Sequence, residues 1–251
     1  VIIKGFKLIP SFKLVMDSVD KLIIYHILMN PRQSKRELAR RVGIDVTTLM
    51  YRLRKLGHLI QGFYLYVNPS IYGFKRFLVV HDHDSLENEN FYFKCIGGFR
   101  ISEVYGESLP KSYLKIYKLD DVKFSLSKLD WKIIKIMSED PLISESEIAN
   151  ITGYSTKTVR RHLNFLIENS VIRVLPSLDL TNGEFFLFSV FSKVKVRRPI
   201  WDFSGITIGF SEDLKEIKKL SDEKYSVAIK AEYGVKNGLR TFNDFQHELN
   251  S

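Results

Sequence analysis

Apolar residues recur at helical spacing in two stretches of the chain, which predicts one amphipathic helix in each. The first stretch is Val19–Met29 and the second is Leu129–Ser138. Asn30-Pro31 and Asp140-Pro141 follow them, and proline pushes the residue before it out of the helical region, so both helices should end there. The apolar positions of the two helices are Val19, Leu22, Ile23 and Ile27, and Leu129, Ile133, Ile136 and Met137.

Each of these helices is followed by signals for two more. Ser34-x-x-Glu37 and Ser144-x-x-Glu147 have the spacing of capping boxes, in which the serine and the carboxylate satisfy each other's backbone N–H groups. Gly43 and Gly153 favour a left-handed helix end. A third helix then starts in each copy after one residue that can cap it. The core face of this helix carries Leu49, Leu53 and Leu56 in the first copy and Val159, Leu163 and Leu166 in the second. The capping residues are Asp45 and Ser155.

The two helical stretches are copies of one sequence pattern. Asp20–Leu56 aligns without a gap with Asp130–Leu166 at a constant offset of 110, and eleven of the 37 positions are identical. A repeat of this length is too long for a solenoid and indicates a duplicated domain. Helix, tight turn with glycine, and helix is the helix-turn-helix arrangement. The identical pairs begin at Asp20/Asp130, Ile23/Ile133, Ile24/Ile134, Pro31/Pro141, Ser34/Ser144, Glu37/Glu147 and Ala39/Ala149, and end with Gly43/Gly153, Thr48/Thr158, Leu53/Leu163 and Leu56/Leu166.

After its third helix each copy enters β-prone sequence with turn residues, which we interpret as a wing. The wing segment is Leu59–Pro69 in the first copy. In the second copy it is Val171–Pro176 followed by Leu178–Gly183. The second copy is longer by two residues just before the wing.

At this point the first copy resembles a known family, the leucine-responsive (Lrp/AsnC) regulators, over their DNA-binding half. The second copy matches less fully and lacks the Val-Asn-Pro end. The residues that carry the resemblance are Asp20, Ile23-Ile24, Asn30-Pro31, Ser34, Glu37-Leu38-Ala39, Val42-Gly43, Thr48, Leu53, Leu56, Ile60-x-Gly62-Phe63 and Val67-Asn68-Pro69.

The resemblance implies a ferredoxin-like βαββαβ effector domain after each wing, and here a shorter β-rich piece follows each copy. The first piece predicts strands at Arg76–Val80, Phe99–Tyr105 and Tyr113–Leu119, with a short helix near Leu86–Cys95. The ligand loop of the family is degraded to Gly106–Pro110, so we do not expect a free amino acid to bind as it does in the family. The second piece predicts strands at Phe185–Val194, Gly205–Phe210 and Tyr225–Glu232, and an amphipathic helix at Lys236–Leu249.

The expected fold class is therefore α+β: two winged helix-turn-helix modules, each followed by a small β-rich, degenerate ferredoxin-like piece. The resemblance further implies that the two pieces pair within one chain, as two chains pair in the family. An edge strand of either piece would also allow a homodimer. We place the boundaries at residues 1–70 and 126–183 for the two modules, and at 71–125 and 184–251 for the two β-rich pieces.

Charge separates the two copies. The chain has a formal charge of +9, which favours an anionic partner. Between Pro31 and Gly57 there are eight basic and two acidic residues, a net +6, whereas Pro141 to Ile167 has three basic and two acidic residues, a net +1. We expect Arg36, Arg40 and Arg41 to contact DNA phosphates, which provide most of the non-specific affinity.

The outer face of each third helix is expected to meet base edges in the major groove. Arginine and asparagine can bind guanine and adenine edges through two hydrogen bonds. A solvated helix face with surplus charge is the alternative reading. The outer residues are Val46, Thr47, Met50, Tyr51 and Arg54 in the first copy, and Thr156, Lys157, Arg160, Arg161 and Asn164 in the second.

Other chemistry is poorly represented. The single cysteine, Cys95, lies among apolar residues, which indicates a buried structural thiol in a reducing compartment. His81-Asp82-His83-Asp84 could begin a metal site but is more typical of a polar strand end. There is no P-loop, Gly-x-Gly-x-x-Gly, Ser-His-Asp or HExxH pattern, and no apolar run of membrane-spanning length. We therefore expect no catalytic residue, cofactor, metal or membrane association.

The sequence thus predicts a cytoplasmic, nucleoid-associated transcriptional regulator that binds double-stranded DNA in a sequence-specific way through two unlike reading heads, with an effector that the sequence does not identify. Two other functions stay open. The sirohaem decarboxylases resemble the same regulators and can be two fused copies, although histidines are few and scattered here. A winged helix can also be a protein-docking scaffold.

Overall fold

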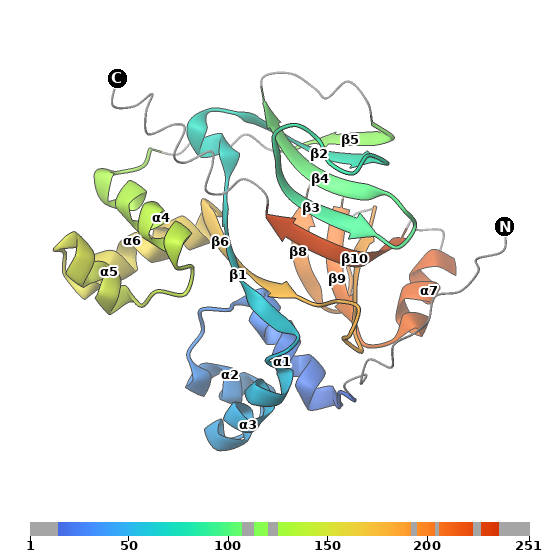
Figure 1. Cartoon of the computed structure of the whole chain (residues 1–251), viewed down its shortest axis with the longest axis horizontal. Helices are drawn as coiled ribbons and strands as arrows, with labels where there is room; N and C mark the ends of the chain where they lie inside the picture. The colour runs from blue at the N-terminus through green and yellow to red at the C-terminus, as the bar shows by residue number, and fades with distance from the viewer. Residues whose placement is uncertain are drawn as a thin grey trace.

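The computed structural model describes residues 15–106, 113–119, 125–191, 195–203, 206–222 and 227–235. Two three-helix units project from the strands, one at the bottom and one at the left of Figure 1. Module one comprises α1 (Ser18–Met29), α2 (Lys35–Val42) and α3 (Val46–Leu56). Module two comprises α4 (Lys128–Glu139), α5 (Glu145–Thr152) and α6 (Thr156–Glu168). The three helices predicted for each copy are confirmed.

The helix starts follow the predicted caps with one exception. Ser144 and Glu147 form a reciprocal capping box at α5. Ser34 accepts from the backbone N–H of Glu37 at α2, but the Glu37 carboxylate binds Arg40 and Arg41 instead of reaching back to Ser34. The predicted box at Ser34 is therefore only half formed, because two guanidinium groups compete for its carboxylate. Two boxes that were not predicted start α1 and α4, formed by Asp17 with Asp20 and by Ser127 with Asp130.

The strand after each third helix pairs with the strand of the other module. β1 (Ile60–Val67) and β6 (Ile172–Leu178) form a two-stranded antiparallel sheet, which we call the ribbon. In the expected wing positions the chain thus builds one shared ribbon rather than two separate hairpins. Figure 1 shows the ribbon passing between the modules toward the main sheet.

The register of the ribbon is that of an internal pseudo-twofold. β6 begins 112 residues after β1, so Phe63 and Tyr64 correspond to Leu175 and Pro176. In the ribbon Phe63 pairs with Pro176 and Tyr64 pairs with Leu175, so exchanging the two copies maps these pairs onto each other. In the same way α1 contacts β6 and α4 contacts β1. Each module therefore packs on the strand of the other.

The remaining strands that the structure describes form one eight-stranded sheet with the order β5-β2-β4-β3-β10-β7-β9-β8. Each half of it has the same internal order, in which the first strand lies between the fourth and the third, and α7 (Leu214–Asp222) precedes the last strand of the second half. The first half comprises β2 (Lys75–His81), β3 (Glu89–Cys95), β4 (Arg100–Gly106) and β5 (Lys115–Lys118), after the 3-10 helix η1 (Pro69–Tyr72). The second half comprises β7 (Phe186–Val190), β8 (Pro199–Phe203), β9 (Ile206–Ser211) and β10 (Val227–Val235).

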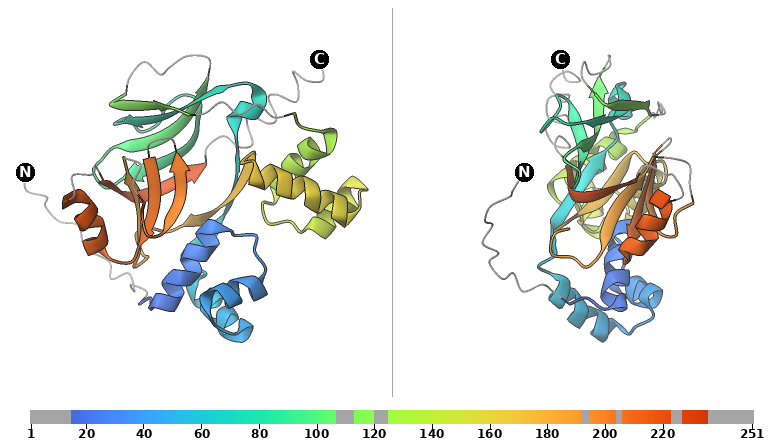
Figure 2. Two further views of the ribbon diagram at one scale, coloured as in Figure 1. Left: turned by 180° about the vertical axis from the view of Figure 1, so that it is seen from behind. Right: turned by 90° about the vertical axis from the view of Figure 1, so that its right-hand side faces the viewer.

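β10 joins the halves, and the sheet curls so that they enclose a core. Its first residues pair with β7 and its later residues pair with β3. Trp201 lies on β8, at the far end of the strand order, yet its ring centroid is 5.4 Å from those of Phe91 and Phe93 on β3. The two halves therefore face each other across these aromatic rings. Figure 2 shows how the strands curl around this core. Burial of such large side chains contributes roughly 25 cal/mol per Å² of apolar surface.

The modules are attached to this body unequally. The core of module one is continuous with the sheet core, since Ile23 and Leu49 belong to the same apolar cluster as Phe93 and Trp201. The core of module two is a separate cluster that includes residues of the ribbon, among them Leu65. Module one is thus embedded in the body, and module two is held at the end of the ribbon.

One prediction about the β-rich pieces is wrong, two elements were missed, and one prediction falls outside the described residues. The short helix expected near Leu86–Cys95 is wrong, because β3 occupies Glu89–Cys95 with Phe91 and Phe93 buried on alternate positions. β8 and α7 were not predicted. The helix expected at Lys236–Leu249 lies outside the described residues. The α+β fold class is confirmed.

Candidate nucleic-acid interface

α3 is positioned by its cap and by its buried face. Gly43 ends α2 with φ +79°, a left-handed conformation that an L-residue with a side chain rarely adopts. Asp45 then caps α3 by accepting from the backbone N–H of Thr48 at 2.8 Å and from its hydroxyl at 2.6 Å. These hydrogen bonds from Thr48 lower the pKa of Asp45. Because Leu49 and Leu56 are buried, the opposite face of α3 points to solvent.

That opposite face carries the predicted base-contacting residues. Tyr51 is 70% exposed, the most exposed large hydrophobic side chain on the described part of α3. Val46, Thr47 and Arg54 are exposed and Met50 is half-buried.

The corresponding face of α6 is also exposed. Thr156, Lys157, Arg160, Arg161 and Asn164 all lie on it, opposite the buried Val159, Leu163 and Leu166. The guanidinium of Arg160 donates to the Glu145 carboxylate on α5 at 2.8 Å. This ion pair is mostly exposed, so it contributes little stability and a DNA group can replace the carboxylate.

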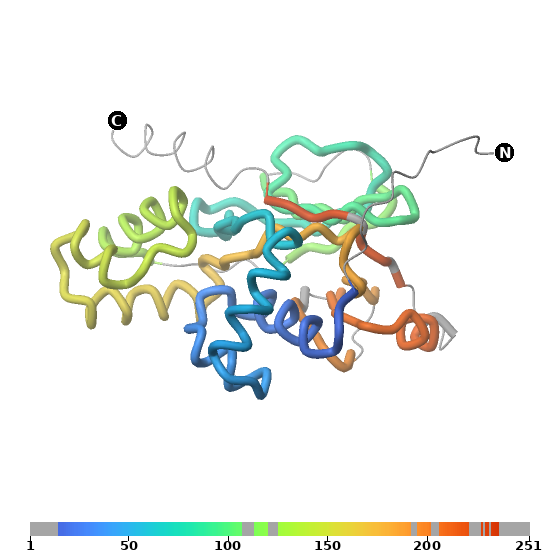
Figure 3. Tube along the Cα trace, turned by 60° about the horizontal axis from the view of Figure 1, so that its bottom comes forward, coloured from blue at the N-terminus to red at the C-terminus, as the bar shows by residue number. Residues whose placement is uncertain are grey.

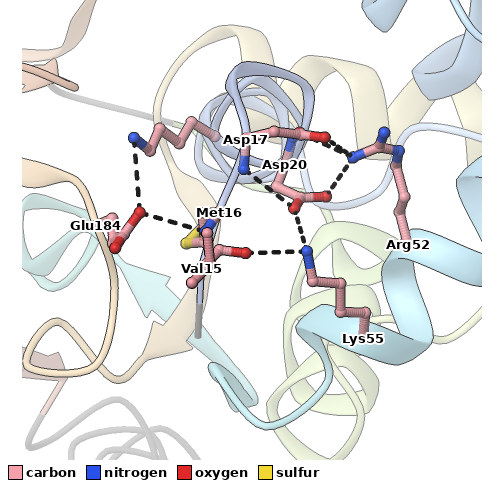
Figure 4. A network of polar contacts seen from close by, with 8 residues as sticks. Val15, Met16, Asp17, Asp20, Arg52, Lys55 and Glu184 are labelled. Carbon is pink, nitrogen blue, oxygen red and sulfur yellow. Dashed lines mark hydrogen bonds and ion pairs between the residues drawn. The ribbon is translucent and has the colours of Figure 1, made fainter. Parts of the chain in front are cut away.

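Buried carboxylates fix the third helices against the first. In module one Asp20 is fully buried and accepts from Arg52 at 2.8 Å and from Lys55 at 2.7 Å (Figure 4). Arg52 also binds Asp17, and its hydrogen bond lowers the pKa of that carboxyl group. α3 therefore cannot shift along α1 without breaking charged contacts in a partly buried site.

Module two uses a different cation at the same place. Asp130 accepts from Ser127 and lies 2.8 Å from Nδ1 of His162, which stands at the position of Arg52 in the repeat. The two reading helices are thus anchored by unlike chemistry. The internal repeat contained this signal, because the spacing from Asp20 to Arg52 equals the spacing from Asp130 to His162.

The predicted phosphate contacts lie on α2 and are exposed, but two of them share a carboxylate. Arg36, Arg40 and Arg41 all face solvent. Arg40 donates to Glu37 at 2.9 Å, and Arg41 donates to it at 2.8 Å. The hydrogen bonds from Arg40 and then from Arg41 hold the pKa of Glu37 below its ordinary value. Exposed ion pairs of this kind contribute little, so a phosphate can replace the carboxylate.

Not all the charge counted in module one faces outward. Arg52 and Lys55 bind the buried Asp20, and Arg32 reaches across to module two. Three of the eight basic residues counted in the sequence therefore support the structure. The charge available to DNA in module one is smaller than the net +6 suggests, and it is concentrated on α2 and at Arg54.

A cleft of about 1040 Å³ separates the two modules. Its walls include Asn30 and Gln33 from module one and Thr156, Arg160 and Asn164 from α6. One edge of the α6 reading face is therefore turned toward module one, a placement that the helical pattern alone could not show. Lys157 and Arg161 lie on the other edge of that face.

The remaining candidates have structural surroundings. Cys95 is buried, and burial raises the pKa of its thiol. His81 is fully buried, with Nε2 2.8 Å from the Ser102 hydroxyl, and burial lowers its pKa, whereas the side chain of His83 is half exposed. Among the described residues no group of three or more His, Cys, Asp or Glu side chains could hold a metal. No helix within the described ranges is both long and apolar enough to cross a membrane.

The helical modules match a known family. A family of winged helix-turn-helix DNA-binding domains matches the chain twice, over residues 16–57 and 126–173. These ranges contain α1–α3 and α4–α6 with the start of β6. Both modules are therefore of the winged helix-turn-helix DNA-binding class.

The whole chain has a more distant likeness to one solved structure. Among solved structures, the siroheme decarboxylase NirDL is similar over 94% of this chain and 100% of its own, with 14% identity and a TM-score of 0.40. At this level the likeness has no functional implication. No curated protein matches the chain.

Proposed function

We propose that this protein is a transcriptional regulator that binds double-stranded DNA in a sequence-specific way through both modules of one chain. The observation that carries the proposal is the pair of exposed third-helix faces on two modules of the DNA-binding class. Each face lies opposite a buried apolar face, and each helix is anchored by a buried carboxylate.

The two modules have unlike roles in this proposal. The paired positions on the two faces differ in chemistry, with Met50 against Arg160 and Arg54 against Asn164. Module one supplies apolar and aromatic contacts, and the basic α2 beside it contacts phosphates. Module two supplies Arg160 and Asn164, which suit guanine and adenine edges. The preferred site should therefore contain two unlike half-sites in a fixed order.

The ribbon supports the pairing of the two modules on one chain. Its register relates them by a pseudo-twofold, and pseudo-twofold heads suit half-sites on one side of a duplex. The proposal includes three further points. The regulator is of the Lrp/AsnC type, it acts on nucleoid DNA in the cytoplasm, and it can form a homodimer through the β-rich pieces.

Selection of bound duplexes from a random library tests the proposal. We expect enrichment of one sequence, with binding to it roughly 10³-fold or more tighter than to unrelated duplex at the same salt concentration. No enrichment, with equally weak binding to all duplexes, would contradict it and would leave protein docking as the role of the helix-turn-helix units. The proposed role involves no catalysis, and addition of a tetrapyrrole should produce no shifted Soret band.

A further inference from the structure

The two modules differ in how firmly they are held. The core of module one merges with the sheet core, whereas the core of module two reaches only the ribbon and η1. Two strands that no further strand flanks form only a marginally stable sheet, so the ribbon alone is a weak support for module two. The position of module two relative to module one therefore depends on any direct contact between them.

Arg32 makes such a contact. It lies in the turn between α1 and α2, and its guanidinium donates to the backbone oxygens of Pro141 and Ile143 in the turn between α4 and α5. Both hydrogen bonds are 2.7 Å long. Burial lowers the pKa of Arg32, while the nearby carboxylates of Glu145 and Asp140 oppose that effect. Arg32 therefore bridges the modules as a cation, and it also lines the cleft that separates them. Figure 3 shows module two beside module one.

The turn that carries Arg32 is itself held in place. The Gln33 side-chain amide donates to the backbone oxygens of His26 at 2.8 Å and Asn30 at 2.9 Å. The backbone N–H of Arg32 donates to the Asn30 side chain at 3.1 Å. The guanidinium thus projects from a fixed turn, and little conformational freedom is lost when it binds module two.

Only an arginine suits this bridge, and only one copy has it. Nη1 and Nη2 of Arg32 reach two different carbonyl groups, which the planar fork of a guanidinium allows and a single ammonium group does not reproduce. The corresponding residue of the second copy is Leu142. The bridge is therefore one-sided and is not a by-product of the repeat.

We propose that Arg32 fixes the position of module two relative to module one and so determines the spacing of the half-sites that one chain can bind at once. The first part of this inference concerns the protein alone. The second part rests on the proposed function, since it requires both modules to bind DNA.

Distance measurement by pulsed electron spin resonance tests the first part without DNA. Spin labels at His58→Cys and Asn150→Cys report the separation of the modules, and the native Cys95 is buried and should not be labelled. We expect a narrow distance distribution for the labelled protein and a broader one after Arg32→Ala or Arg32→Lys. Arg36→Ala removes an exposed charge of the same kind and should leave the distribution unchanged. Equal widths for all variants would overturn the inference.

A series of duplexes with altered half-site spacing tests the second part. Two linked heads gain avidity only when both can bind at once, so a shift of half a helical turn should weaken wild-type binding by about 100-fold. After Arg32→Ala the same shift should cost only about tenfold, because module two can follow the displaced half-site. Arg36→Ala should weaken binding at every spacing alike.

The outcomes separate the inference from the function on which it rests. A broader distance distribution with no selective DNA binding would refute the proposed function and support the positioning role of Arg32. Selective binding with the same spacing profile before and after Arg32→Ala would refute the role of Arg32 in spacing and leave the proposed function intact.

Discussion

Replacing Arg40 and Arg41 by alanine tests whether α2 contacts phosphates, and the structure sets the size of the effect. Each phosphate contact that is lost should reduce the slope of log K against log salt concentration by about 0.9. If each arginine leaves Glu37 to bind a phosphate, the double variant should flatten the slope by about 1.8. If both stay on Glu37, the group carries a net +1 and the slope should change by only about 0.9.

The exposure of the group favours the larger value. Arg40 is 76% exposed and Arg41 is 48% exposed, so neither is held by the protein interior. Loss of both arginines also leaves the negative charge of Glu37 without its two ion-pair partners, and this charge would itself repel the DNA phosphates. The triple variant with Glu37→Gln removes this repulsion and isolates the arginine contribution.

Fluorescence anisotropy with labelled duplex, at salt concentrations from about 50 to 200 mM, measures the slope. Lys218→Ala with Lys219→Ala is a control of equal charge on α7, where both side chains are exposed. In Figure 1 α7 lies apart from both modules. We expect the control to keep the wild-type slope. We expect the α2 variants to prefer the same DNA sequence as the wild type. An unchanged slope after loss of Arg40 and Arg41 would refute the assignment.

Three further predictions concern other parts of the chain. Arg160→Ala should weaken binding to the selected site by about 1–3 kcal/mol and binding to random DNA much less, as competition titrations would show; equal losses would mean that Arg160 contacts phosphate only. Asp20→Asn should lower the free energy of unfolding by about 3 kcal/mol in urea titrations. This value is at the low end of the range for a broken buried ion pair, because Arg52 still binds the carboxylate of Asp17. A change near zero would contradict the anchoring role of Asp20. Burial lowers the pKa of Lys230 from 10.5 to about 8, so between these pH values the unfolded chain holds a proton that the folded chain has lost. The free energy of unfolding should therefore rise by about 1.5 kcal/mol from about pH 8 to 9.5 in the wild type relative to Lys230→Met. Parallel curves of unfolding free energy against pH for the two proteins would contradict this.

The helical modules were predictable because their signals are local. Caps, turn glycines and apolar spacing lie within a few residues of one another, and the repeat presents each signal twice. The anchoring of α6 could have been inferred in part, since the spacing of Asp130 and His162 copies that of Asp20 and Arg52. Residue type alone did not show that Arg52 points inward, because a basic residue near a helix end is usually solvated.

The β-rich pieces were less predictable because their order depends on distant partners. Phe91, Phe93 and Cys95 alternate with more exposed positions, a two-residue period that indicates a strand, yet the resemblance to a βαββαβ domain suggested a helix there. The pairing of β1 with β6 joins residues more than 100 positions apart, and no local pattern specifies it. The bridge from Arg32 to Pro141 has the same origin, since it depends on how the modules are placed.

Hydroxyl-radical footprinting of a single chain on its selected duplex tests the central claim most directly. The claim is that both modules of one chain bind DNA at the same time. It predicts two protected blocks of unlike sequence in a fixed order, with their centres about one or two helical turns apart at roughly 34 Å per turn. A palindromic site, or protection of one block only, would contradict it.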